Sequence, residues 1–209
     1  AAYPDKAITL SVGERSAEAY AAFKEAGANR FLLRHETRND EHYAQLHPSM
    51  MSSENRRNCL YTLKQLGFQT GSGMMIGSPG QTDEHLYEDI KFLEDLQPQM
   101  IGIGPFLPAT YTPFENQYPG SADKTILMLS LLRLRFPKVL LPATTALATL
   151  CPDGMERAIL AGANVVMPNI SPLEQRKKYS IYDNKKSTGA ESAQQMQQLE
   201  DRLNTIGYH

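Results

Sequence analysis

The sequence predicts an α/β fold with parallel strands inside and helices outside, namely a partial TIM-type (β/α) barrel. Short β-type runs alternate with amphipathic helical runs along all 209 residues, which is typical of strands paired in parallel through helical crossovers. About six strand–helix units occur, whereas a complete barrel has eight in roughly 250 residues. The first run begins close to Ala1, so we expect units one and two to precede it and the chain to hold units three to eight. A doubly wound open sheet is the competing architecture.

Each unit is marked by residues that begin or end a helix. Strands are expected at residues 7–12, 31–34, 69–76, 99–104, 140–141 and 164–167. Helices are expected at residues 16–26, 52–66, 83–96, 124–136, 155–161 and 190–204. Gly27 and Gly67 end the first two helices, and Thr82 caps the start of the third. Pro98 and Pro137 follow the third and fourth helices, which they cannot continue.

The composition is ordinary for a globular protein, so we expect a single domain over residues 1–209 with a helical tail over 184–209. A formal net charge of −2 gives no reason to expect nucleic acid or an anionic membrane as a partner. No apolar run approaches the roughly 20 residues that span a bilayer. The two cysteines, Cys59 and Cys151, suggest no disulfide framework, so a reducing cytoplasm is the expected compartment. Cys59 lies on the apolar side of its predicted helix and is expected to be a buried, inert thiol.

Polar and glycine residues follow five successive predicted strands, at the ends where ligands bind in parallel α/β folds. Arg34 and Glu36 follow the second strand and point to the same face because side chains alternate along a strand, whereas His35 points to the other face. A cation and a carboxylate aimed into a barrel mouth suit an amino-acid-like ligand. A structural ion pair at the barrel rim is the alternative.

Glycines mark the next two strand ends. The run 71–82 permits close approach of the backbone to a ligand and opens onto a helix N-terminus, which favours anions. Turn formation alone also explains Gly77 and Gly80. Gly102 and Gly104 share one face of the following strand, where they leave room for a flat ring or for close helix packing.

Hydroxyl and aromatic side chains follow the last two strands. Thr144 and Thr145 either bind an anion or cap local backbone groups. Tyr179 and Tyr182 come after the strand that ends at Met167, and they either cover a ligand or pack on the surface. No H-E-x-x-H, G-x-S-x-G or Walker A motif occurs, and the five histidines have no compact ligand spacing. We therefore predict no metal site in this chain.

Taken in order, these strand-end segments resemble one enzyme family. The run 73–82 is similar to the glycine-rich motif that radical S-adenosylmethionine (SAM) barrels share. A narrower set resembles the radical SAM maturases that help to build the dithiolate bridge of the FeFe-hydrogenase H-cluster, with methylornithine synthase and biotin synthase as nearest relatives in the superfamily. That set comprises residues 34–37, 54–56, 102–106, 142–146 and 162–169, and the resemblance extends over residues 8–182.

The resemblance implies a role for each candidate residue. Glu36 and Arg56 would bind the polar part of SAM, and Arg56 suits its carboxylate through a bidentate fork. The nucleoside side of the pocket would be lined by Met167, Tyr179 and Tyr182. The substrate in the barrel cavity would be faced by Arg34, Thr144 and Thr145. No catalytic residue is assigned to this chain.

The resemblance also implies the reaction. In the family, a reduced 4Fe-4S cluster cleaves SAM to a 5'-deoxyadenosyl radical, which attacks a sulfur-containing substrate such as an iron-bound cysteine precursor. The C-x3-C-x2-C loop that holds the cluster lies after the family's first barrel strand and has no counterpart here. We therefore interpret the chain as the C-terminal portion of such a maturase, inactive by itself. Maturation proteins are the expected partners of the complete enzyme.

Two other interpretations stay open. One is a related radical SAM enzyme of the biotin synthase or methylornithine synthase type, which differs only in its substrate pocket. The other is a non-catalytic α/β module that binds a nucleoside. An incomplete barrel would leave strands 7–12 and 164–167 without lateral partners, so we also expect the chain to self-associate through these edges.

Overall fold

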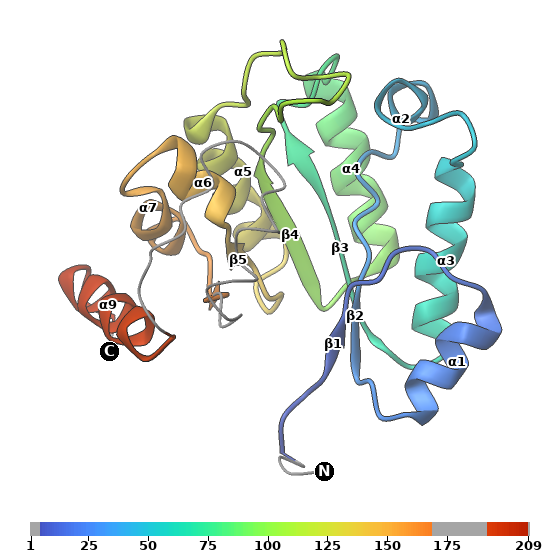
Figure 1. Cartoon of the computed structure of the whole chain (residues 1–209), viewed down its shortest axis with the longest axis horizontal. Coiled ribbons are helices and arrows are strands. Elements are labelled where there is room, and N and C mark those ends of the chain that lie inside the picture. The colour runs from blue at the N-terminus through green and yellow to red at the C-terminus, as the bar shows by residue number, and fades with distance from the viewer. Residues whose placement is uncertain (1–4, 169–191, 209) are drawn as a thin grey trace. The chain divides into compact units, whose positions relative to one another are not determined.

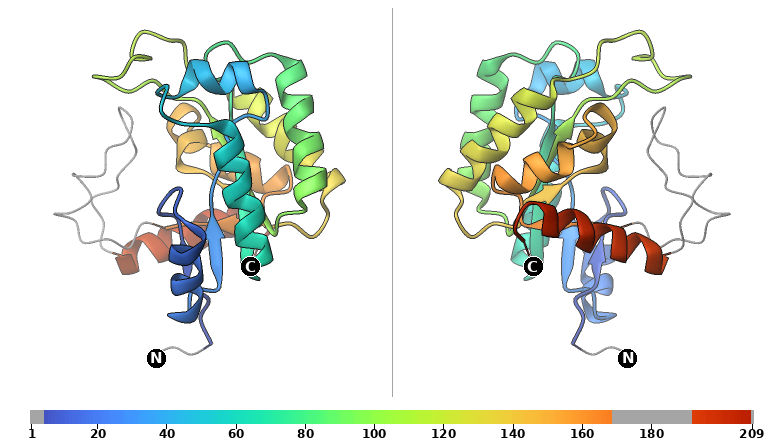
Figure 2. Two further views of the ribbon diagram at one scale, coloured as in Figure 1. Left: turned by 90° about the vertical axis from the view of Figure 1, so that its right-hand side faces the viewer. Right: turned by 90° about the vertical axis from the view of Figure 1, so that its left-hand side faces the viewer.

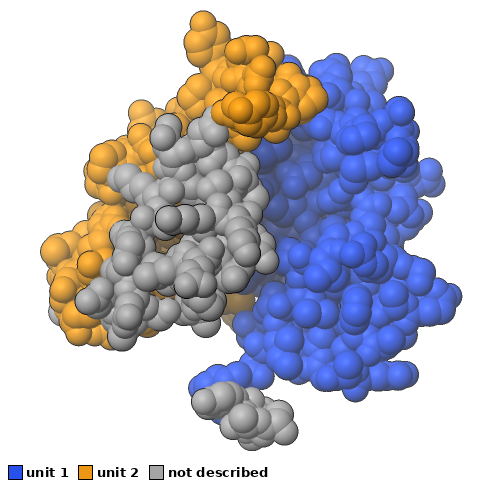
Figure 3. Space-filling model, in the orientation of Figure 1, with its two compact units in different colours: residues 1–75, 80–102 blue, residues 76–79, 103–209 orange. Residues whose placement is uncertain are grey.

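The computed structural model describes residues 5–168 and 192–208. Within these residues strands and helices alternate along the chain, and the strand pairs β1–β2, β2–β3 and β5–β6 are parallel, as predicted (Figure 1). The chain divides into two compact units, residues 1–75 with 80–102 and residues 76–79 with 103–209 (Figure 3). The division falls within strands β3 and β4, so both units contain parts of these two strands.

The first unit carries the first four predicted strands and their helices. Its strands are β1 (Thr9–Leu10), β2 (Arg30–Leu32), β3 (Gln69–Ile76) and the first part of β4 (Met100–Pro105). Its helices are α1 (Ala17–Glu25), α2 (Asp40–Leu46), α3 (Ser53–Gln65) and α4 (Asp83–Leu96). The strands follow one another in the order β1-β2-β3-β4. Figures 1 and 2 show that α1, α3 and α4 lie on one side of these strands.

Side-chain caps fix where the helices of the first unit begin. Ser16, Ser52 and Thr82 each accept a hydrogen bond from a backbone N–H in the first turn of α1, α3 and α4. Thr82 and His85 form a reciprocal capping box, so the predicted start of α4 is confirmed. The helix α2 was not predicted, although it begins in the same way at the side chain of Asn39.

Three aromatic rings form the centre of the first unit's core. Tyr20 of α1 meets Phe31 of β2 edge to face, with the ring centroids 5.1 Å apart, and Phe68 meets Phe31 in the same way at 5.9 Å. Leu63 of α3 is fully buried in this cluster. Cys59 lies in the same cluster and is buried, which confirms its predicted place on the apolar side of the helix. The core thus attaches α1 and α3 to β2.

The second unit contains the end of β4 and the remaining elements. They are α5 (Ala122–Arg135), β5 (Pro142–Ala143), α6 (Thr145–Leu150), α7 (Gly154–Leu160), β6 (Val165–Val166) and α9 (Ser192–Thr205). The predicted tail helix is therefore a helix, and Arg202 of α9 forms a two-pronged ion pair with Glu156 of α7 at 2.5 and 2.7 Å. In the described ranges no helix is both long and apolar enough to cross a membrane.

Close backbone packing explains one of the strand-end glycines. Gly73 of β3 has a φ of +153°, and a Cβ atom at this position would lie 1.9 Å from the carbonyl oxygen of Gly102 in β4. Real side chains do not tolerate such a contact with backbone atoms. Gly73 is therefore required by the approach of two strands, irrespective of any ligand.

We expect the substitution Gly73→Ala to lower the free energy of unfolding by about 3 kcal/mol, because the methyl group would force the two backbones apart. Gly67→Ala is the matched control, because Gly67 also has a positive φ of +75° but a Cβ atom there would meet no other atom within 4 Å. This control should cost only about 1 kcal/mol from backbone strain. Urea denaturation of both variants measures the difference, and equal costs would contradict the close approach.

Candidate functional site

Two arginines and two carboxylates meet at the ends of β1 and β2 and at the start of α3. Glu14 follows β1, Arg34 and Glu36 follow β2, and Arg56 lies in the first turn of α3. Arg34 Nη2 lies 3.4 Å from Glu36 Oε2, and Arg56 Nε lies 2.5 Å from Glu14 Oε1. Arg56 Nη1 also donates to the carbonyl oxygen of Arg34 at 3.1 Å, which joins the two ion pairs. These four residues are called the charged cluster below.

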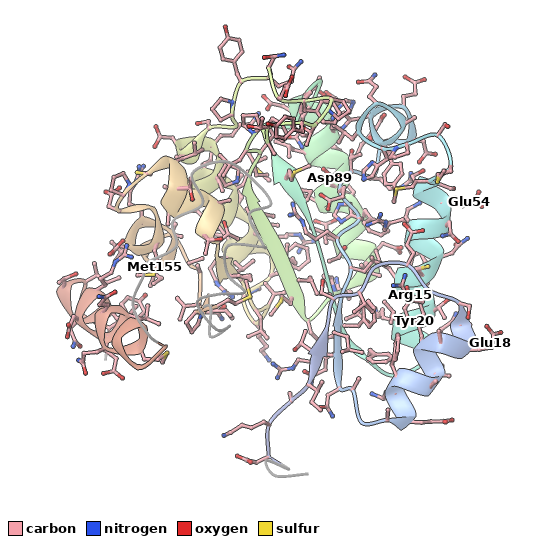
Figure 4. The ribbon with its side chains drawn as sticks, in the orientation of Figure 1. Arg15, Glu18, Tyr20, Glu54, Asp89 and Met155 are labelled. Atoms are coloured by element: carbon pink, nitrogen blue, oxygen red, sulfur yellow. The ribbon has the colours of Figure 1, made fainter. Side chains whose placement is uncertain are left out.

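The aromatic core holds Glu14 in its place. The Tyr20 hydroxyl accepts a hydrogen bond from the Arg15 backbone N–H at 3.0 Å and donates to the Gly13 carbonyl oxygen at 3.3 Å, so it fixes the backbone on both sides of Glu14. Figure 4 shows Tyr20 and Arg15 beside each other. The Cys59 thiol adds a weak hydrogen bond to the Arg15 carbonyl oxygen at 3.7 Å. Burial raises the pKa of Tyr20, so its hydroxyl stays protonated at neutral pH.

The backbone at Glu36 adopts the left-handed conformation, with a φ of +68° that is uncommon outside glycine. The Glu36 N–H donates to the carbonyl oxygen of Gly73 at 3.0 Å, and Glu36 pairs with Met74 in an isolated parallel bridge. The ion pair with Arg34 confirms that Arg34 and Glu36 share one face. His35 points the other way, as predicted, toward Ser72 and Asp89, and it is buried.

Several polar atoms of the charged cluster are buried without a hydrogen-bond partner among the described residues. They include Arg34 Nε and Nη2 and Glu36 Oε2. The Arg34–Glu36 separation of 3.4 Å is longer than a charge-assisted hydrogen bond of about 2.7–2.9 Å. Unsatisfied buried polar groups are rare in native proteins because each costs about 1–3 kcal/mol. The cluster is therefore a place that a polar ligand would complete.

Tyr43 of α2 borders the charged cluster. Its ring centroid lies 6.0 Å from Arg56 Cζ, and its hydroxyl is buried without a hydrogen-bond partner among the described residues. Burial raises the pKa of Tyr43, although the positive charge of Arg56 opposes this effect. Tyr43 therefore presents a neutral hydroxyl next to the two arginines.

The candidate residues of the second unit lie after β5 and β6. Thr144 is the N-cap residue of α6 but makes no capping hydrogen bond, and its Oγ1 is buried without a partner among the described residues. A Cβ atom on Gly104 would lie 2.8 Å from this oxygen, so Gly104 makes room for Thr144. Thr145 is exposed in the first turn of α6, and Met167 is 52% exposed.

The structure brings Arg34, Glu36 and Arg56 together within the first unit. The tyrosines predicted to cover the nucleoside, Tyr179 and Tyr182, lie outside the described residues. Sequence analysis missed Glu14 and Tyr43. Glu14 follows the first predicted strand directly, so the rule that was applied to the later strand ends would have found it. Tyr43 lies in α2, which no sequence pattern predicted.

A polar groove of about 830 Å³ lies elsewhere in the first unit. It is lined by Arg38, Asn39, Asp40, Glu41, Arg57, Asn58, Tyr61, Tyr87, Glu88, Lys91, Phe92 and Asp95. These residues belong to α2, α3 and α4 and to the segment that leads into α2, and no residue of the charged cluster is among them. Within the groove Arg57 pairs with Asp40 at 2.7 Å, and this pairing lowers the pKa of Asp40.

Comparison with known proteins identifies the class of this fold and site. Residues 3–93 match the family model of the Radical SAM superfamily. Its sequence is 48% identical over 179 residues to the [FeFe] hydrogenase maturase subunit HydE of Thermotoga maritima, across 86% of this chain and 51% of that protein. The resemblance predicted from the strand ends is thereby confirmed.

A second relative is 3-methylornithine synthase of Methanosarcina acetivorans, which is 32% identical across 80% of this chain and 47% of that protein. The solved structure of methylornithine synthase (PylB) matches with a TM-score of 0.80 at 28% identity, across 97% of this chain and 58% of that chain. The chain thus spans about half the length of the curated relatives that it matches.

The residues of this chain do not fit a 4Fe-4S cluster, which cysteine thiolates hold in proteins. The chain has only two cysteines. Cys59 is packed in the core of the first unit, and the Cys151 thiol in the second unit donates to Asp153 Oδ1 at 2.7 Å. The charged cluster does fit the amino-acid end of SAM, because Arg34 Nε makes no hydrogen bond among the described residues and the loose Arg34–Glu36 ion pair offers a donor to a carboxylate and an acceptor to an ammonium group.

We expect Tyr43→Phe to raise the free energy of unfolding by about 1 kcal/mol, because it removes a buried hydroxyl that lacks a partner. Tyr61→Phe is the matched control, since the Tyr61 hydroxyl donates to Asp95 Oδ2 at 2.5 Å. The control should leave stability unchanged or lower it. Urea denaturation measures both variants, and a clear loss of stability in Tyr43→Phe would show that its hydroxyl is satisfied without a ligand.

Proposed function

We propose that this chain is the portion of a radical SAM enzyme that binds the amino-acid end of SAM, and that the complete enzyme matures the FeFe-hydrogenase H-cluster. One observation carries the SAM assignment: a charge-balanced cluster of two arginines and two carboxylates at two strand ends and a helix start, in which buried atoms of Arg34 and Glu36 make no hydrogen bond among the described residues. The 48% identity to HydE supports the choice of hydrogenase maturation over methylornithine synthesis.

The amino-acid end of SAM carries a carboxylate and an ammonium group, and the charged cluster offers partners for both. Arg56 is held by Glu14 at Nε and by the Arg34 carbonyl oxygen at Nη1, so its planar guanidinium is oriented before a ligand arrives. Glu36 offers a half-buried carboxylate to the ammonium group or to ribose hydroxyls. A cluster that is already oriented loses little entropy on binding. SAM, when bound, supplies the 5'-deoxyadenosyl group that the family uses.

We extend this proposal to the remaining candidate residues. Arg34 and Thr144 would face the substrate, and the buried, unpaired Oγ1 of Thr144 supports a polar contact there. Thr145 would face the substrate as well. The nucleoside would be lined by Met167, Tyr179 and Tyr182. The substrate would be a sulfur-containing small molecule such as an iron-bound cysteine precursor.

The proposal also covers the setting in which the enzyme works. We expect a cytoplasmic enzyme that uses a 4Fe-4S cluster whose ligands are not in this chain, with other maturation proteins as partners. The chain alone would self-associate through open strand edges. The edge strand β1 supports this expectation, because it pairs with β2 on one side only in the order β1-β2-β3-β4.

Calorimetric titration of SAM into the 209-residue chain tests the SAM site. We expect Arg56→Gln to weaken SAM binding roughly tenfold or more, because a charge-assisted hydrogen bond to the carboxylate is lost. Arg57→Gln is the matched control: Arg57 is the next residue of α3, is also ion-paired, and lines the separate groove. The control should bind SAM as the unmodified chain does. Equal losses in the two variants, or no binding by the unmodified chain, would refute the proposal.

A further inference from the structure

A buried polar network lies directly behind Glu36. The His35 ring is fully buried, with Nδ1 3.0 Å from Ser72 Oγ and Nε2 3.3 Å from Asp89 Oδ1. Asp89 is labelled in Figure 4 and lies on α4 with an exposed fraction of 0%. It shares the buried face of that helix with apolar side chains. These are Leu86, Phe92, Leu93 and Leu96.

A buried carboxylate lowers the free energy of unfolding, because burial removes its hydration. Asp89 Oδ2 is buried without a partner among the described residues, so the cost is only partly offset. Apolar side chains of similar volume often stabilise a protein as well as a buried ion pair does. Stability alone therefore gives a weak reason for Asp89, and its contacts indicate another role.

Asp89 contacts the chain on both sides of Glu36, at His35 and at Arg38. Asp89 Oδ1 lies within hydrogen-bond distance of His35 Nε2 and accepts the backbone N–H of Arg38 at 2.6 Å. The segment between these two residues is fixed as well. The Glu36 N–H donates to Gly73, and Thr37 Oγ1 is buried 3.1 Å from His42 Nδ1. Every residue from 35 to 38 is thus held by at least one hydrogen bond.

This arrangement explains how a glutamate persists in the left-handed conformation. A non-glycine residue with a φ of +68° is strained and stays there only when its surroundings over-determine it. Glu36 lies between β2 and α2, and in this conformation its carboxylate lies beside Arg34. Without the network, the backbone at residue 36 would relax toward more common conformations and the carboxylate would move.

We propose that Asp89, acting through His35 and the Arg38 backbone, is a positioning residue that holds Glu36 in its left-handed conformation for ligand binding. The inference rests on the proposed function, because Glu36 is there assigned to SAM. Asp89 itself touches no ligand in this proposal. Its effect on SAM affinity must therefore pass through Glu36.

The test is a double-mutant cycle measured by calorimetric titration of SAM. We expect Asp89→Leu to weaken SAM binding about tenfold, because it removes the acceptor of the Arg38 N–H and the partner of His35 that hold Glu36 in place. Circular dichroism checks that the variant remains folded. Combined with Glu36→Gln, the same substitution should add less than about twofold, because coupled residues are not additive. A purely structural role predicts equal losses in both backgrounds, and that result would overturn the proposal.

A conservative variant and a matched control accompany the double-mutant cycle. Asp89→Asn keeps an oxygen acceptor for the Arg38 N–H and should recover most of the lost affinity. Asp95→Leu is the control, because Asp95 lies on the same helix but is exposed and bonded to Tyr61. It should leave SAM affinity unchanged. If Asp89→Leu does not fold, Ser72→Ala removes the other partner of His35, and a loss of SAM affinity that vanishes in the Glu36→Gln background would carry the same conclusion.

A second readout needs no ligand. Amide hydrogen exchange should be faster at Glu36 and Arg38 in Asp89→Leu than in the unmodified chain, whereas Asp95→Leu should leave both rates unchanged. This readout separates the two proposals. Failure of the unmodified chain to bind SAM would refute the SAM site alone, and unchanged exchange at Glu36 would refute the positioning role of Asp89.

Discussion

Parallel pairing of β1, β2 and β3 is the constraint on which the charged cluster depends. The registers Thr9 with Arg30 and Arg30 with Gln69 align the strands, so the segments that leave them emerge at the same edge. Glu14 and Arg34 are twenty residues apart in sequence, yet both follow aligned strands. Arg56 then reaches this edge from the first turn of α3, where a helix begins at the Ser52 cap. The site is therefore a consequence of register and capping more than of any local motif.

The residues at the strand ends were predictable, because the pattern of residue types along a strand indicates which face each side chain points to. Alternation of side chains along a strand correctly placed Arg34 and Glu36 on one face and His35 on the other. Helix starts at serine and threonine were predictable for the same reason, since a cap is a local interaction. The helices α2 and α6 were missed: with seven and six residues they display little helical period, although α7, which is also seven residues long, was predicted.

Contacts between elements that are distant in the sequence could not be predicted from the local sequence pattern. Nothing local shows that the Tyr20 hydroxyl fixes Glu14, or that Gly104 makes room for Thr144. The sequence does contain one indication of a buried polar contact. Asp89 lies on the apolar face of α4, at helical spacing with leucines and a phenylalanine. An acidic residue at such a position needs a buried partner, which here is His35.

Arg56 and Glu36, the two charges proposed to contact SAM, are each supported by a buried polar group from a different helix. Tyr20 of α1 fixes the loop of Glu14, and Glu14 in turn orients Arg56. Asp89 of α4 fixes the segment that carries Glu36. The arginine and the glutamate are also linked through Arg34, whose carbonyl oxygen accepts from Arg56 and whose guanidinium lies beside the Glu36 carboxylate, so the geometry between them depends both on this link and on the packing of α1, α3 and α4 on the strands. Under the proposed function the cofactor supplies the difficult chemistry, and the chain then needs such rigidity more than it needs reactive side chains, because its contribution would be to place the cofactor and the substrate.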